Sequence, residues 1–184
     1  MSGLLDLPAI RERMLRLSVD EYHRWTEGQP TELLHGIVIK KMSKSPLHYA
    51  TIEALREILS GQIKPGWVLR QEGPLTFADS EPEPDLAIVR GRRSDYRQAH
   101  PVSAELVIEV AVSSFEIDLV KGHVYAEAAI PEYWIVCPEE KRVEVFRLPQ
   151  GPDGYAEHII VSAPDFLKSS VLPNIQVDLA TLFV

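Results

Sequence analysis

The sequence has few of the residues that cross-link a protein or anchor it in a membrane. It contains one cysteine, Cys137, in 184 residues, so it can form neither an internal disulfide nor a cysteine-based zinc cluster. No stretch approaches the roughly 18 consecutive apolar residues that span a bilayer. Residues 1–16 mix charges with leucines and lack the apolar core of a signal peptide. We therefore expect a cytoplasmic protein with no membrane association.

Positive charge is also scarce. The chain carries 19 Lys and Arg against 27 Asp and Glu, which gives a formal net charge of −8. Bulk attraction to nucleic acid is thereby disfavoured, although a local basic groove is not excluded. The composition, 45% hydrophobic and 25% charged, is that of a globular protein and not of a disordered one. The length and the absence of a linker or repeat predict a single domain over residues 1–184.

Apolar and turn-forming residues alternate in a pattern typical of an α/β protein. A capping box at Ser18 and Glu21 predicts a helix that ends near Gly28, and Ser45-Pro46 predicts the start of a second helix. Further segments are predicted as a hairpin at 32–40, strands at 67–70, 74–77, 84–89, 105–112, 132–137, 142–148 and 155–161, and a helix at about 116–129. We expect a mixed β-sheet flanked by helices, with the apolar C-terminus docked on it.

One carboxylate lies inside an otherwise apolar predicted strand. Glu109 is costly there unless it is paired, bound to a metal or placed at the rim of the sheet. Asp85 follows a proline at the start of the preceding predicted strand. If the two strands are adjacent, both carboxylates meet at one end of the sheet and suit Mg²⁺, which takes oxygen ligands and keeps several waters. Asp118 and Lys121 share one face of the next helix, so Lys121 can point toward that site.

Other interpretations of these residues remain open. Glu109 could form an ion pair with a basic residue of the facing helix, and Glu32 could pair with Lys40 or Lys41 across the hairpin. Asp85 by itself is typical of a turn, and a lone helix lysine is usually solvated.

Two clusters of basic residues stand out against the acidic balance. The densest lies in the loop of residues 90–97, and the second lies at residues 40–44. We predict that Arg92, Arg93 and Lys44 contact nucleic-acid phosphates and that the clusters flank a groove. A solvated loop is the alternative for the arginines.

Several motifs follow one another along the chain. They are Glu32–Gly36, Met42-Ser43 with His48, Pro84-Asp85, Glu109-Val110-Ala111, Asp118…Lys121…Tyr125, Pro131–Trp134 and the segment Val171–Phe183. This ordered series resembles the Uma-type putative restriction endonuclease family of the PD-(D/E)xK nuclease superfamily. The resemblance implies a restriction-endonuclease-like core with an extra N-terminal hairpin and C-terminal strands.

The resemblance also implies a function, a metal-dependent nuclease that hydrolyses phosphodiester bonds in DNA with Mg²⁺ or Mn²⁺. Asp85 and Glu109 would be catalytic metal ligands, joined by the carbonyl of Ala111, which stands where the superfamily has its lysine. Lys121 would take over the role of that lysine, and Glu32 would be a further catalytic carboxylate. The implied accessory residues are His48, Ser113 and Asp118.

Two other functions stay open at this point. The missing lysine at Ala111 favours a catalytically inactive nuclease-fold module that serves binding or assembly. A metal-dependent hydrolase of small phosphoesters would not need the basic loop. By analogy with nucleases that cut both strands, we expect a homodimer.

Overall fold

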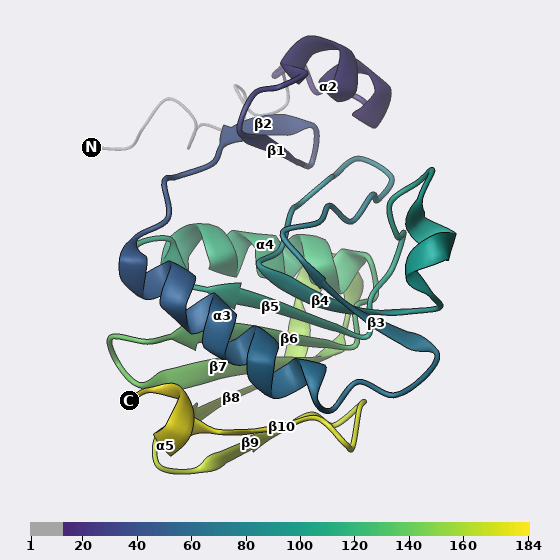
Figure 1. Ribbon diagram of the computed structural model, residues 1–184. Coiled ribbons are helices and arrows are strands. Elements are labelled where there is room, and N and C mark those ends of the chain that lie inside the picture. Colours follow the sequence, from purple (N-terminus) through teal and green to yellow (C-terminus); the bar gives the residue numbers. More distant parts are fainter. Residues whose placement is uncertain (1–12) are drawn as a thin grey trace, which may run out of the picture.

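The computed structural model describes residues 13–184, and a six-stranded sheet forms its centre (Figure 1). The strand order is β3-β4-β5-β6-β7-β8, in which β5 and β6 pair in parallel and the other neighbours pair antiparallel. The strands are β3 (Trp67–Gln71), β4 (Leu86–Arg90), β5 (Leu106–Val110), β6 (Glu132–Cys137), β7 (Arg142–Pro149) and β8 (Tyr155–Ser162). The predicted mixed sheet is confirmed.

One helix covers each face of this sheet. Helix α3 (Pro46–Ser60) packs on the face that carries Ile108 of β5, and α4 (Phe115–Glu127) packs on the opposite face, which carries Val107. Because side chains alternate along a strand, Glu109 points to the same side as Val107, toward α4. Burial on both faces explains the almost uninterrupted apolar sequence of β5.

The N-terminal elements form the predicted hairpin, which lies above the sheet in Figure 1. Helix α2 (Val19–Thr26) leads into β1 (Thr31–Leu34) and β2 (Ile37–Lys40), a separate two-stranded sheet. Its turn places His35 and Gly36 at φ 49° and 73°, the left-handed conformation that tight hairpins require. A bridge between Leu33 and Glu81 fastens the hairpin to the segment that precedes β4.

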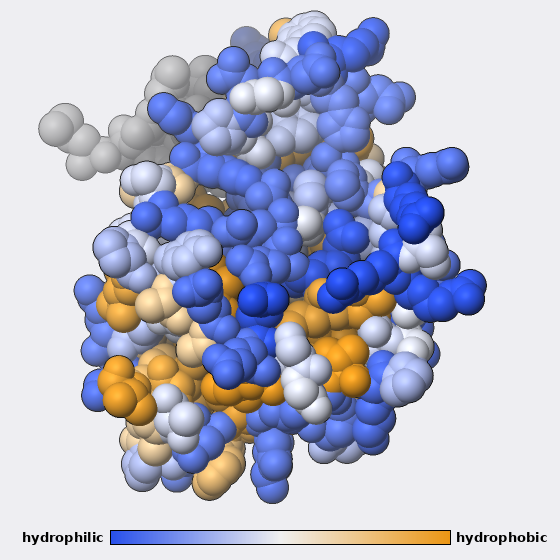
Figure 2. Space-filling model, viewed as in Figure 1, coloured by the Kyte–Doolittle hydropathy of each residue, from blue (hydrophilic) through white to orange (hydrophobic). Residues whose placement is uncertain are grey.

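The C-terminal segment docks on the α3 side of the sheet. It forms β9 (Phe166–Lys168), β10 (Gln176–Asp178) and the short helix α5 (Leu179–Leu182), and residues 172–183 contribute apolar side chains to the core around α3. Figure 2 shows hydrophobic residues gathered around α3 and hydrophilic residues over α2 and the hairpin. The fold class, including the extra hairpin and C-terminal strands, is confirmed.

Some local predictions were wrong. Residues 74–77 form no strand, because the amides of Leu75 and Phe77 donate to Pro82 and Ser80 within a compact loop. The predicted loop after β4 contains a short 3₁₀ helix, η2 (Arg93–Tyr96), and a second, η3 (Gly151–Asp153), lies in the loop between β7 and β8. Within residues 13–184, no helix has the length and apolarity needed to cross a membrane.

Candidate functional site

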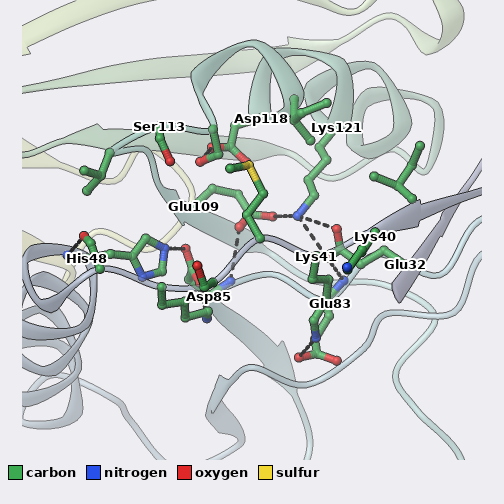
Figure 3. Close-up of a pocket in the computed structure, with 18 residues that line it drawn as sticks. Glu32, Lys40, Lys41, His48, Glu83, Asp85, Glu109, Ser113, Asp118 and Lys121 are labelled. Carbon is green, nitrogen blue, oxygen red and sulfur yellow. Dashed lines mark hydrogen bonds and ion pairs between the residues drawn. The ribbon is translucent and has the colours of Figure 1, made fainter. Parts of the chain in front are cut away.

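The candidate site is a pocket between the hairpin and the first turns of α3 and α4 (Figure 3). Its floor comes from the chain that enters β4 and the end of β5, and its mouth comes from the segment that joins β2 to α3. Eight predicted site residues line it: Glu32, Lys44, His48, Asp85, Glu109, Ser113, Asp118 and Lys121.

Strand pairing brings Asp85 and Glu109 together, as the sequence predicts. In the antiparallel register Leu86 faces Ile108, so the preceding Asp85 lies beside Glu109. The amide of Asp85 donates to Glu109 Oε2 at 3.3 Å, and the amide of Val110 donates to Asp85 Oδ2 at 2.8 Å. The carboxylates are only 5% and 3% exposed, so each needs a partner for its charge.

Lys121 reaches the same point from α4. Its ammonium donates to Glu109 Oε1 at 3.0 Å and lies 2.9 Å from Glu32 Oε2, while Tyr125 donates its hydroxyl to Glu109 Oε1 at 2.8 Å. The ion-pair interpretation of Glu109 is therefore confirmed, since it pairs with a lysine of the facing helix, and its role as a metal ligand stays a prediction. The hairpin alternative for Glu32 is wrong, because its ion-pair partner is Lys121.

The electrostatics of this cluster follow from one ammonium serving two buried carboxylates. Burial raises the pKa of Glu109 well above its ordinary value, and Lys121 only partly opposes this. Burial also raises the pKa of Asp118, to about 6. For Lys121 burial acts to lower the pKa, but the neighbouring Glu109 and Glu32 outweigh it and raise the pKa above its usual value. Lys121 therefore stays protonated.

Asp85 has two further partners at the mouth of the pocket. Lys44 Nζ donates to Asp85 Oδ1 at 2.8 Å and to Glu72 Oε1 at 2.5 Å, and His48 Nε2 lies 3.1 Å from Asp85 Oδ2. Burial would raise the pKa of Asp85, but His48 and Lys44 outweigh burial and lower it. The predicted nucleic-acid residue Lys44 is thus in the pocket and touches a proposed metal ligand.

The remaining residues predicted near the metal divide into two groups. Ser113 is exposed and lines the mouth, and the buried Asp118 accepts a 2.6 Å hydrogen bond from the Ser114 hydroxyl. The side chain of Ala111 packs into the core on the α4 side. The predicted ligand is the carbonyl oxygen of Ala111, and its role stays a prediction.

The arginine loop is not part of this pocket. Arg92 and Arg93 follow the far end of β4, whose near end lies directly after Asp85, and a strand of that length spans roughly 17 Å. They line a different surface hollow beside Trp67. The expectation that both basic clusters flank one groove is wrong for the arginines, and only the 40–44 cluster borders the site.

Two residues that complete the cluster, Tyr125 and Glu72, have no role predicted from the sequence. Tyr125 lies four residues after Lys121 and so on the same face of α4, a spacing that could have marked it. Glu72 carries no comparable signal. It reaches the site because its amide donates to the Asp85 carbonyl at 3.1 Å, beyond the end of the β3–β4 pairing.

The carboxylate oxygens of the pocket fit a hard divalent cation that takes few of its ligands from the protein and keeps several waters. No group of three or more His, Cys, Asp or Glu side chains among residues 13–184 is arranged to hold a metal ion. Mg²⁺, however, is commonly held by one or two carboxylates and its own waters, and Asp85 with Glu109 supplies that smaller set. Within residues 13–184, Glu109 Oε2 accepts one long backbone hydrogen bond and Asp85 Oδ1 accepts one hydrogen bond, from Lys44.

Comparison with known proteins identifies the family of this chain and a solved structure with a similar fold. The model of the Uma2 family, described as putative restriction endonuclease, matches residues 19–180. The chain belongs to the Uma2 family. Among solved structures, a crystal structure of a putative nuclease belonging to DUF820 from Anabaena variabilis superposes with a TM-score of 0.73 at 18% identity. The match covers 91% of this chain and 97% of that chain, which shows a shared fold. A search of curated proteins found no match.

Proposed function

We propose that this Uma2 protein is a metal-dependent nuclease that hydrolyses phosphodiester bonds in DNA at the Asp85–Glu109 pocket. The observation that carries the proposal is the meeting of these two carboxylates at the rim of the sheet, with the Lys121 ammonium 3.0 Å from Glu109. Family membership supports nuclease-like function, and the carboxylate pair supports the choice of a metal-assisted reaction.

Asp85 and Glu109 would hold Mg²⁺ or Mn²⁺. Such a cation lowers the pKa of a bound water and neutralises charge on a phosphate. Two backbone amides fix these carboxylates, that of Asp85 directly before β4 and that of Val110 in β5. Because these donors lie in or directly beside the paired strands, the carboxylates are held in place before any ligand arrives.

Lys121 acts as a fixed positive charge in this proposal. Its pKa is raised above that of a free lysine, so it stays protonated and cannot accept the proton of an attacking water. It instead orients Glu109, together with the Tyr125 hydroxyl, and offers an ammonium to charge that develops on the phosphate.

Basic residues lie at the mouth of the pocket, although the net charge of −8 disfavours bulk attraction of the protein to nucleic acid. Lys40, Lys41 and Lys44 border the pocket, so ammonium groups lie where a phosphate would enter, although Lys41 pairs with Glu83 and Lys44 with Asp85 and Glu72. DNA contact of this local kind is salt-sensitive and does not need a basic protein.

A pair of matched variants tests the proposal. The chain has other Pro-Asp pairs, and in one of them the exposed Asp165 lies in the turn between β8 and β9. Cleavage of supercoiled, linear and single-stranded DNA is measured with Mg²⁺ or Mn²⁺ for wild type, Asp85→Asn and Asp165→Asn. We expect metal-dependent cleavage that Asp85→Asn abolishes and Asp165→Asn retains. Equal cleavage by wild type and Asp85→Asn would overturn the assignment.

The inactive binding module is favoured by one observation, the pairing of Asp85, Glu32 and Glu109 with the chain's own lysines. It differs from the nuclease in predicting no cation at the carboxylates. Calorimetric titration with Mn²⁺ separates the two, since binding that is present in wild type and lost in Glu109→Gln supports the metal site.

A further inference from the structure

The two oxygens of Asp85 have partners of different kinds. Oδ2 accepts from the Val110 amide at 2.8 Å and lies 3.1 Å from His48 Nε2, so it is held by strand β5 and helix α3. Oδ1 accepts from Lys44, whose long side chain comes from the segment between β2 and α3 and is 34% exposed. Oδ1 is therefore the oxygen whose partner can leave without disturbing the sheet or a helix.

A divalent cation that took this oxygen as a ligand would compete with the Lys44 ammonium. The ammonium lies 2.8 Å from Oδ1, so such a cation would lie close to it. Two positive groups at such a separation repel each other strongly in a partly buried site. Binding of the cation at Asp85 thus requires Lys44 to withdraw.

Lys44 does not have to leave the pocket when it withdraws. Its second partner, Glu72, is 38% exposed and lies 2.5 Å from the same ammonium. Glu72 can keep the charge at the mouth, on the side from which a phosphate enters.

We propose that Lys44 is the built-in counter-ion of Asp85 in the metal-free protein, and that it yields Oδ1 to the divalent cation and then binds a phosphate of the DNA. This inference rests on the proposed nuclease function and adds an order to it, in which the cation releases the lysine that recognises the substrate.

The proposal predicts opposite effects of one substitution on two ligands. Loss of the Lys44 ammonium removes the competitor of the cation, so cation binding becomes tighter. The same loss removes a phosphate contact, so DNA binding becomes weaker. A residue with a merely structural role would weaken both.

Lys41 supplies the matched control. It carries the same charge in the same segment and lines the same pocket, but its ammonium pairs with Glu83. Lys41→Met therefore reports the general effect of removing one positive charge near the site, and any excess effect of Lys44→Met reports direct competition at Asp85.

The experiment measures two affinities for wild type, Lys44→Met, Lys44→Gln and Lys41→Met, each checked for folding by circular dichroism. Calorimetry gives the Kd for Mn²⁺, and fluorescence anisotropy gives the affinity for a DNA duplex in Ca²⁺, which also takes oxygen ligands. We expect both Lys44 variants to lower the Kd for Mn²⁺ about tenfold, and Lys41→Met to change it less than about threefold. The Lys44 variants should also weaken DNA binding and reduce the slope of log affinity against log salt by about 1.

The possible results separate this inference from the proposed function. If wild type binds Mn²⁺ and the Lys44 variants bind it no more tightly than Lys41→Met does, the counter-ion role of Lys44 is overturned while the metal site stands. If wild type and Asp85→Asn both fail to bind Mn²⁺, the metal site itself fails, and the role of Lys44 fails with it.

Discussion

Replacing Glu132 by glutamine offers a sensitive test of how the C-terminal segment is held to the sheet. Glu132 lies in β6 and is 0% exposed. Its Oε1 accepts from Trp134 Nε1 and Arg147 Nε, both at 3.0 Å, and its Oε2 accepts from the Ser169 hydroxyl at 2.7 Å and the Ser170 amide at 2.9 Å. One carboxylate thus joins β6, β7 and the chain that precedes β10.

The expected cost follows from the donors that Glu132→Gln leaves without an acceptor. An amide in either orientation points its NH₂ group at groups that are themselves donors, and the charge opposite Arg147 is lost. Each buried donor left unsatisfied costs about 1–3 kcal/mol, and breaking a buried ion pair costs about 3–5 kcal/mol. Because these contributions overlap, we expect a loss of about 3–5 kcal/mol in the free energy of unfolding.

Glu157→Gln is the control, because Glu157 contacts the same arginine from the surface. Its carboxylate lies 3.6 Å from Arg147 Nη1 and is 42% exposed, and an exposed pair of this kind contributes up to about 1 kcal/mol. Equilibrium unfolding in urea, followed by tryptophan fluorescence and circular dichroism, measures both variants. If Glu132→Gln is destabilised no more than Glu157→Gln, the hydrogen bonds of Glu132 do not hold the C-terminal segment to the sheet.

Two further measurements address other buried groups. Lys121→Met removes the cation from the buried Glu109, whose pKa burial already raises. A glutamate whose pKa is raised in the folded state contributes stability below its unfolded pKa, and this stability is lost as the pH rises. We therefore expect the variant to lose about 3–5 kcal/mol in the free energy of unfolding at pH 7.5 and less at pH 5. Urea unfolding at both pH values measures it, and an equal or larger loss at pH 5 would contradict the argument. Burial raises the pKa of the Cys137 thiol to about 11 from 9.0, which lowers the thiolate fraction at pH 8 about a hundredfold. We therefore expect Ellman's reagent to react at least that much more slowly with Cys137 in the folded protein than in guanidinium, and comparable rates would refute a buried thiol.

The sequence by itself was sufficient to predict the features that depend on residues close together along the chain. The Ser45 cap with Pro46 predicted the start of α3, where the Ser45 hydroxyl accepts from the His48 amide at 3.2 Å. The apolar run around Glu109 predicted a strand buried on both faces, because such a run is stable only between two layers. Periodicity and caps are local signals, so they can be read before the chain is folded.

The same local signals also limited the prediction. Strands β9 and β10 have three residues each, which is too short for a periodic pattern to distinguish them from loop. The proposed pair of Asp85 and Glu109 needed one more assumption, that β4 and β5 are neighbours, and the register confirmed it.

Only the tertiary structure decided which side chains share the charges of the site. Lys121 pairs with Glu32 across 89 residues of sequence, and Lys44 reaches Asp85 across 41, while the arginine loop lies at the far end of β4. Such partners depend on sheet order, helix placement and the direction in which each side chain leaves the backbone. Spacing along the chain carries no information about these. The residue types therefore indicated the chemistry of the pocket, and the packing of the hairpin, the sheet and α4 selected the ammonium groups that neutralise it.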